Sequence, residues 1–156
     1  MRETSNGARL REEILARSVE KTWEHARPEW SLAHIEFAEE PRTCLCGHYP
    51  IIELCYLGNR LNHEEALVGN VCVTRFFDLG SHLVFDGLRR VLLDATRPLN
   101  AAATAFAAER GWVTAWEVGF LGNTVRKRQL SSRQEATRVK INTALTARVR
   151  RGPREG

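Results

Sequence analysis

The alternation of hydrophobic and polar positions predicts a mixed succession of helices and short strands in the first half of the chain. A helix is predicted over about residues 8–25, and Pro28 ends it. Its apolar stripe comprises Leu15, Val19, Trp23 and Ala26. Residues 30–37 alternate with one slip in phase and predict a strand, and the runs at 51–57 and 66–68 predict two more. A turn is expected at 58–63, and residues 71–77 resemble the first turns of a helix.

Helical patterns dominate the second half. Ser81 is a suitable cap for a helix that ends near Thr96, and Asn100 is a suitable cap for an alanine-rich helix that Gly111 ends. A helix over about 132–149 is predicted because Ser131–Gln134 and Ser132–Glu135 each fit a capping box. The aromatic and branched stretch 112–120 is interpreted as core, either helical or extended.

Length and composition limit the classes of protein to consider. The chain has 156 residues, of which 43% are hydrophobic and 27% are charged, so we do not expect a large multidomain enzyme. It has no run of about 18 apolar residues, so no membrane-spanning helix is expected. The N-terminal residues lead into a charged stretch, which is atypical of a secretory signal, and we therefore expect a cytoplasmic protein.

The net charge of +4 conceals an uneven distribution. Residues 121–156 hold ten Lys and Arg against two Glu, a net charge of +8, whereas the first 120 residues carry −4. Such asymmetry indicates a polyanion partner at the basic end, although a solvated tail is the simpler alternative. In the predicted final helix, Arg133, Lys140 and Arg151 would lie within roughly 20° of one another. The candidate nucleic-acid contacts are Arg126, Lys127, Arg128, Arg133, Lys140, Arg148, Arg150 and Arg151. We expect contacts mainly to the phosphate backbone, with weak sequence specificity.

Four cysteines lie close together in the sequence and predict a metal site. They are Cys44, Cys46, Cys55 and Cys72. In a reducing compartment, clustered thiols bind metal more often than they form disulfides, and four of them suit a tetrahedral Zn²⁺ site. Cys44 and Cys46 are separated by one residue, fewer than in common fingers, and Gly47 is expected to let the backbone turn tightly and point its N–H groups at the sulfurs. Cys55 lies in a strand-like run and is alternatively a buried core thiol, in which case His48 is the replacement ligand and His63 a weaker one.

The cysteine region resembles the treble-clef class of zinc fingers. The resemblance rests on Cys44-Leu-Cys-Gly-His48, on Cys55 and on the segment Val68–Phe76. More loosely, the chain is similar to small, largely uncharacterised proteins of bacteriophages and mobile elements, which share a C-x-C-G-H knuckle and a V-G-x-x-C-V-x-x-F segment. Further matching features are Gly111–Glu117 and Arg126–Gln134. The resemblance implies a knuckle, a hairpin and a cysteine-bearing helix start, but no established activity.

Together these patterns predict an α+β fold, in which a small treble-clef-like β-hairpin and helix unit packs with several α-helices. We expect an N-terminal helix and strand at 1–40, a zinc-finger-like unit at 41–80, a helical region with a basic C-terminal helix at 81–150 and a disordered tail at 151–156. One compact domain overall is expected.

Three functions are consistent with this sequence. The favoured hypothesis is a zinc-stabilised protein that binds DNA or RNA through its basic helix, associated with a phage or mobile element. The alternatives are an adapter that binds a host protein, and a metal-dependent nuclease that uses His48, His63, His82 or the pair Glu64–Glu65. An enzyme is not the favoured interpretation, because nucleophile, phosphate-loop and His-Glu-x-x-His motifs are missing from the sequence.

Overall fold

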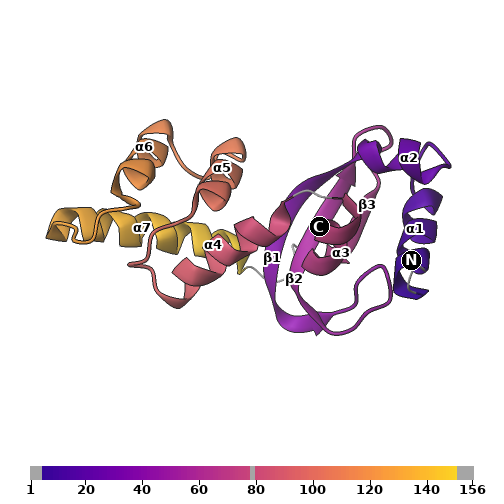
Figure 1. Ribbon diagram of the computed structural model, residues 1–156, viewed down its shortest axis with the longest axis horizontal. Helices are drawn as coiled ribbons and strands as arrows, with labels where there is room; N and C mark the ends of the chain where they lie inside the picture. Colours follow the sequence, from indigo (N-terminus) through magenta and orange to yellow (C-terminus); the bar gives the residue numbers. More distant parts are fainter. Residues whose placement is uncertain (1–4, 78–79, 151–156) are drawn as a thin grey trace. The chain divides into compact units, whose positions relative to one another are not determined.

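The computed structural model describes residues 5–77 and 80–150, and its architecture is mixed α+β, as predicted (Figure 1). The chain forms two compact units. One comprises the described residues up to Ser81 together with Arg150, and the other comprises His82–Val149. The tail predicted at 151–156 lies outside the described residues.

The first unit contains a three-stranded antiparallel sheet in the order β1–β2–β3. β1 spans Trp30–Arg42, β2 spans Ile51–Asn59 and β3 spans Glu65–Gly69. All three predicted strands are therefore confirmed, each somewhat longer than expected. The slip in phase predicted in the first strand is also present, as an irregularity in the ladder between Leu32 and His34.

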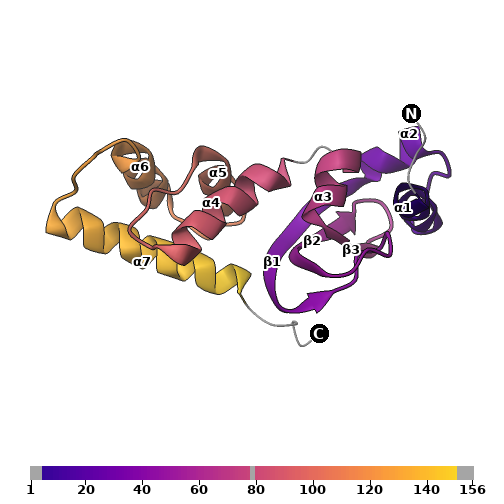
Figure 2. The same ribbon diagram turned by 60° about the horizontal axis from the view of Figure 1, so that its bottom comes forward.

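Short helices flank this sheet. α1 spans Ser5–Ala16 and α2 spans Trp23–Ala26, followed by a 3₁₀ turn at Arg27–Glu29. α3 spans Asn70–Cys72 and continues into a π-helical turn at Val73–Phe77. Figures 1 and 2 show α3 against β2. The Arg11 guanidinium lies 5.2 Å from the Trp23 ring and 5.8 Å from the Phe76 ring, and so links α1 to α2 and to the turn after α3.

The prediction of one helix over residues 8–25 is wrong, because residues 17–22 are irregular. Val19, assigned to the buried stripe, is 52% exposed, whereas Leu10 and Ile14 are fully buried. The cause is Glu29, whose carboxylate accepts hydrogen bonds from the backbone N–H groups of Val19 (2.8 Å) and Glu20 (2.9 Å). These N–H groups are therefore not available to continue the ladder of α1.

Glu29 is only 3% exposed and connects three segments of the first unit. Asn59 Nδ2, at the end of β2, donates a third hydrogen bond to the same carboxylate at 2.9 Å. Burial raises the pKa of Glu29, but the hydrogen bonds from Asn59 and the two backbone amides, with the charge of Lys21, outweigh it and lower the pKa overall. A carboxylate suits this position because all three neighbours are donors.

We predict that Glu29→Gln lowers the free energy of unfolding by about 1–3 kcal/mol at neutral pH, because an amide turns an N–H group toward these donors. The folded pKa is depressed, so the contribution of the carboxylate is complete above the unfolded pKa of about 4.3. It is lost as the pH falls through the folded value. In urea denaturation, the difference from wild type should therefore shrink in acid. Exposed Glu24→Gln is the control, and a difference that does not depend on pH would contradict this account.

The second unit is helical, with α4 at Ser81–Leu93, α5 at Ala101–Glu109, α6 at Ala115–Thr124 and α7 at Ser132–Val149. In Figures 1 and 2, α7 runs alongside the other helices of this unit. The buried apolar side chains are Val84, Phe85, Leu88, Val91, Leu99, Ala103, Phe106, Ala107, Val113, Leu121, Ile141, Leu145 and Val149. α4 ends at Leu93, slightly before the predicted end.

Side-chain caps fix where these helices begin. Asn100 Oδ1 accepts a hydrogen bond from the Ala103 N–H at 2.8 Å, as predicted. Of the two possible capping boxes before α7, the structure forms Ser131–Gln134, with both reciprocal hydrogen bonds at 3.1 Å. Gly111 ends α5 with φ of +69°, a left-handed conformation that favours glycine.

The stretch 112–120 is core only in part. A capping box between Thr114 and Glu117 begins α6 and makes this stretch helical from Ala115. Val113 is buried, but Trp116 is 66% exposed, so the prediction that the aromatic cluster is core is wrong for Trp116. The cap fixes the start of the helix, and the packing of Leu121 and Thr124 places a different side of α6 against the core.

Two neighbouring polar residues of α7 hold the other helices in place. The guanidinium of Arg138, which is 4% exposed, donates hydrogen bonds to the carbonyls of Thr96 (3.1 Å) and Thr124 (2.7 Å). One turn later, Asn142 Nδ2 donates to the carbonyls of Ala95 and Arg97, both at 2.9 Å. Thr124 is the last residue of α6, so a cation lies at the negative end of that helix. Burial lowers the pKa of Arg138.

We predict that Arg138→Met lowers the free energy of unfolding by roughly 2–4 kcal/mol, because the buried Thr124 carbonyl and the Thr96 carbonyl both lose their donors. Chemical denaturation followed by circular dichroism measures the effect. Arg133→Met removes an exposed arginine of the same helix and should change the free energy of unfolding by less than about 0.5 kcal/mol. Equal effects of the two substitutions would contradict the role given to Arg138.

Candidate metal centre

The loop between β1 and β2 forms a tight knuckle around its two cysteines. The Cys44 N–H donates to the His48 carbonyl at 2.9 Å, and the Gly47 N–H donates to the Cys44 carbonyl at 2.8 Å. Gly47 has φ of +93°, as expected of the glycine predicted to make this turn. The Leu45 N–H donates to the Leu67 carbonyl at 3.0 Å and fastens the knuckle to β3.

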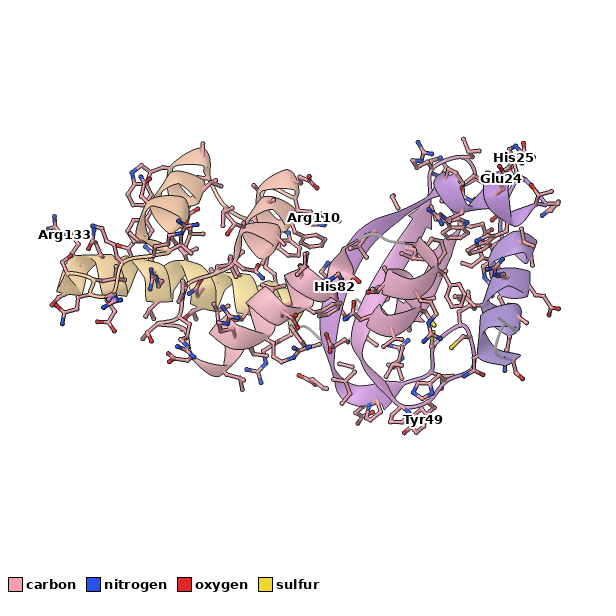
Figure 3. All side chains as sticks on the ribbon, viewed as in Figure 1. Glu24, His25, Tyr49, His82, Arg110 and Arg133 are labelled. Atoms are coloured by element: carbon pink, nitrogen blue, oxygen red, sulfur yellow. The ribbon has the colours of Figure 1, made fainter. Side chains whose placement is uncertain are left out.

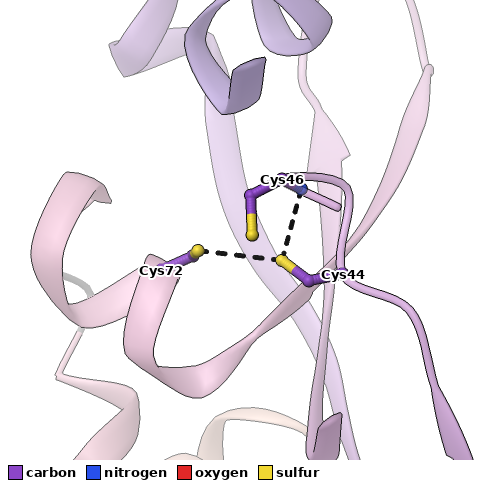
Figure 4. A group of neighbouring side chains, drawn as sticks. All are labelled: Cys44, Cys46 and Cys72. Atoms are coloured by element: carbon purple, nitrogen blue, oxygen red, sulfur yellow. Dashed lines mark hydrogen bonds between the residues drawn. The ribbon is translucent and has the colours of Figure 1, made fainter. Parts of the chain in front are cut away.

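The knuckle and α3 bring three cysteines together. The Sγ atoms of Cys44, Cys46 and Cys72, here called the cysteine cluster, all lie within 4.8 Å of one another (Figure 4). Cys44 and Cys46 are buried, and Cys72 is half-buried. Three thiol sulfurs this close together can hold one metal ion, since each supplies one ligand atom.

Backbone N–H groups point at two of the sulfurs. Cys44 Sγ accepts from the N–H groups of Gly69 (3.3 Å) and Cys46 (3.5 Å), and Cys46 Sγ accepts from the His48 N–H at 3.4 Å. Donors in these positions stabilise negative charge on sulfur and orient the ligands of a thiolate metal site. The donor set therefore fits a bound cation.

The three thiols do not titrate independently. The hydrogen bond with Cys72, with Sγ atoms 3.7 Å apart, and the N–H groups of Cys46 and Gly69 lower the pKa of Cys44 despite its burial. The same interaction with Cys44 raises the pKa of Cys72, and burial raises the pKa of Cys46. These interactions favour a thiolate at Cys44 over one at Cys46 or Cys72, and a bound cation would favour ionisation of all three.

Cys55, the fourth cysteine predicted as a ligand, is not part of the cluster. It is fully buried on the central strand, opposite Ile35 and Val68, and Ser81 is its hydrogen-bond partner. Burial raises the pKa of Cys55 to about 12, so this thiol is neutral at physiological pH. These surroundings match the alternative interpretation of Cys55 as a core thiol.

The cysteine cluster opens into a cavity of about 500 Å³. Its wall includes His48, Glu53 and Arg75, as well as the apolar side chains of Ile51 and Phe76. His48 is exposed, and its ring is not within the 4.8 Å group. Asn6 and Gly7 at the start of α1 also line the cavity.

Sequence reasoning missed the part of α1 that reaches the knuckle. A side chain at Gly47 would collide with the Arg9 guanidinium, since a Cβ there would lie 2.6 Å from Arg9 Nη1. Arg9 therefore places a cation against the knuckle. No local pattern predicts the contact between Arg9 and Gly47, because the two residues are far apart in the sequence. By contrast, the V-G-x-x-C spacing places Gly69 three residues before Cys72 and could have indicated that it lies near the sulfurs.

The residues considered for a nuclease do not gather into a second centre. His63, Glu64 and Glu65 are exposed around the hairpin turn, where His63 has φ of +62°, and His82 is exposed at the start of α4 (Figure 3). Among the residues that the structure describes, the cysteine cluster is the one group of three or more His, Cys, Asp or Glu side chains suited to a metal.

The predicted nucleic-acid contacts lie mostly in the second unit. Its exposed members are Arg126, Lys127, Arg128, Arg133, Lys140 and Arg148. Figure 3 labels Arg133, which projects from the beginning of α7. Arg150 is exposed and belongs to the first unit, and Arg151 lies outside the described residues. The Arg148 guanidinium lies 5.8 Å from the Trp112 ring centroid.

No protein-family model, curated protein or solved structure matches this chain. Within residues 5–77 and 80–150, no helix combines the length and apolar character needed to cross a bilayer.

We predict that Cys44→Ser, Cys46→Ser and Cys72→Ser each weaken metal binding by more than about 100-fold, because each removes one sulfur ligand. Competition with a chromophoric chelator measures the apparent affinity. Cys55→Ala is the matched control and should bind within a few-fold of wild type. A loss in Cys55→Ala as large as that in Cys72→Ser would restore Cys55 to the ligand set.

Proposed function

We propose that this protein is a zinc-stabilised nucleic-acid-binding protein that contacts mainly the phosphate backbone. The observation that carries the proposal is the charge of the second unit. Residues 82–149 hold eleven Lys and Arg against five Asp and Glu, a net charge of +6. Residues 1–81 carry −4, so the excess of cations belongs to the helical unit.

The availability of these cations supports the proposal. The six exposed Lys and Arg between positions 126 and 148 form no ion pair with any residue in the described ranges. Arg133 and Lys140 are seven residues apart in α7 and so lie about 20° apart around its axis. Arg138, which is buried and bonded to two carbonyls, is not available to a ligand. The expected mode is charge contact with successive phosphates, accompanied by counterion release.

Zinc is the metal that we propose for the cysteine cluster. Three thiolates suit Zn²⁺, which prefers four ligands in a tetrahedron. His48 is our candidate for the fourth position because it belongs to the knuckle and lines the same cavity. A metal held by the knuckle and by α3 would fix these segments to each other, which is the role of a structural zinc. The order of knuckle, hairpin and Cys72-bearing helix supports the treble-clef assignment, which remains part of this proposal.

Thiolate ligands stay reduced in the cytoplasm, and this is the compartment that we propose. The association with phages or mobile elements rests on the resemblance of the knuckle and the V-G-x-x-C segment alone.

We predict that binding to DNA or RNA weakens steeply with salt. The slope of log affinity against log salt should be about −0.9 for each phosphate contacted in duplex DNA and about −0.7 in a single strand. Replacing Arg126 and Arg128 by Gln should reduce the magnitude of that slope by between one and two. Fluorescence anisotropy with a labelled oligonucleotide measures both quantities.

The matched control replaces two exposed arginines of the acidic first unit, Arg27 and Arg42, by Gln. It makes the same change in net charge and should leave the slope unchanged. If the two double variants lose affinity equally, binding follows net charge and not this surface. If wild-type protein binds neither DNA nor RNA at low salt, the proposed function is wrong.

A further inference from the structure

α6 carries a stacked pair of aromatic rings, one exposed and one half-buried. Trp116 is 66% exposed, and its ring stacks on that of the half-buried Phe120, with centroids 5.5 Å apart and planes inclined by 15°. The exposed indole leaves a flat π surface accessible to a ligand.

Gly119 comes directly before Phe120 in α6. A methyl group added at Gly119 would meet no atom within 4 Å, so no neighbouring segment covers this position.

Three consecutive cations follow the end of α6 in the sequence. The Lys127 N–H donates to the Thr124 carbonyl at 3.1 Å, so Lys127 lies in a hydrogen-bonded turn after the last residue of the helix. Arg126 and Arg128 are exposed on either side of it.

The acidic residue of this helix does not oppose an anionic ligand. Glu117 is the acid nearest to Trp116 in α6, and its carboxylate accepts a hydrogen bond from the Thr114 N–H at 2.8 Å in the capping box. α6 therefore carries the stacked rings, and three consecutive cations follow it in the chain.

We propose that the surface formed by Trp116, Gly119, Phe120 and residues 126–128 binds unpaired bases of a single-stranded nucleic acid. A base stacks on the exposed indole, and the cations hold the flanking phosphates. Bases in a duplex present their edges and not their faces, so an exposed ring gains little from them. This inference rests on the proposed function and names the form of nucleic acid that the unit prefers.

Charge favours this occupant over an apolar protein. A protein-docking surface has an apolar centre with few charges. Here a run of three cations follows the helix that carries the two rings. Binding to an acidic protein segment in place of an oligonucleotide would be an outcome against the inference.

The test compares a labelled oligothymidylate with a duplex of the same length, using the full chain with zinc at fixed moderate salt. Trp116→Ala should weaken binding of the single strand on the order of tenfold and leave duplex affinity unchanged. Trp116→Phe keeps a stacking ring and should retain most of the affinity. Leu93→Ala removes another apolar side chain of this unit, 82% exposed, and should change neither affinity.

A second readout reports stacking itself. Binding of oligothymidylate should quench the tryptophan fluorescence of wild type, and Trp116→Phe should lose this quenching while still binding. Oligonucleotide binding that Trp116→Ala leaves intact, or that favours the duplex, overturns the inference but leaves the proposed function standing. Absence of any nucleic-acid binding overturns both.

Discussion

The first unit depends on the meeting of three sulfurs that come from two distant parts of the chain. Cys44 and Cys46 belong to the knuckle after β1, and Cys72 lies in α3, beyond the other two strands. N–H groups point at Cys44 and Cys46 and favour a thiolate at Cys44, whereas further thiolates this close to it would be repelled. A bound cation would remove this repulsion. The knuckle, the end of β3 and the start of α3 would then be held by a single centre, which would add to the small apolar core of a unit of this size.

Away from the cysteines, a buried charge in each unit collects hydrogen bonds from separate segments. Glu29 accepts from the irregular segment 17–22 and from Asn59, whereas Arg138 donates to the turn after α4 and to the end of α6. The two arrangements are opposite in sign but follow one rule, since a buried ion is stable where several backbone groups of the opposite polarity converge on it. Arg138 also shows why charge counted along a sequence overstates a binding surface. Arg138 is a cation of the basic helix that stabilises the fold. The surface proposed to contact phosphates is therefore made by its exposed neighbours.

The features predicted correctly from the sequence are those whose cause is local. The alternation of hydrophobic and polar positions predicted the three strands, and Asn100 and Ser131 predicted where two helices begin. Gly47 and Gly111 predicted two turns, and both residues have a positive φ. The errors have distant causes. Periodicity alone continued the first helix through Val19, because the carboxylate that interrupts it is ten residues away. Cys55 was grouped with the other cysteines by spacing, although strand pairing buries it beside Ile35 and Val68. The Thr114–Glu117 capping box is a local signal for the start of α6, but the outward position of Trp116 depends on which side of that helix packs against its neighbours.

The helical unit has an excess of exposed cations and an exposed tryptophan that stacks on Phe120, whereas the cysteine unit has a net negative charge. Its proposed ligand is recognised by phosphate charge and by base stacking, so the metal would act through stability and not through contact. The whole account therefore rests first on the metal. Native mass spectrometry of the chain, purified without added metal or chelator, measures the bound ion directly. We predict one Zn²⁺ per chain, lost when any residue of the cysteine cluster is replaced. A folded wild-type chain that carries no metal and takes up none from equimolar zinc would contradict the account.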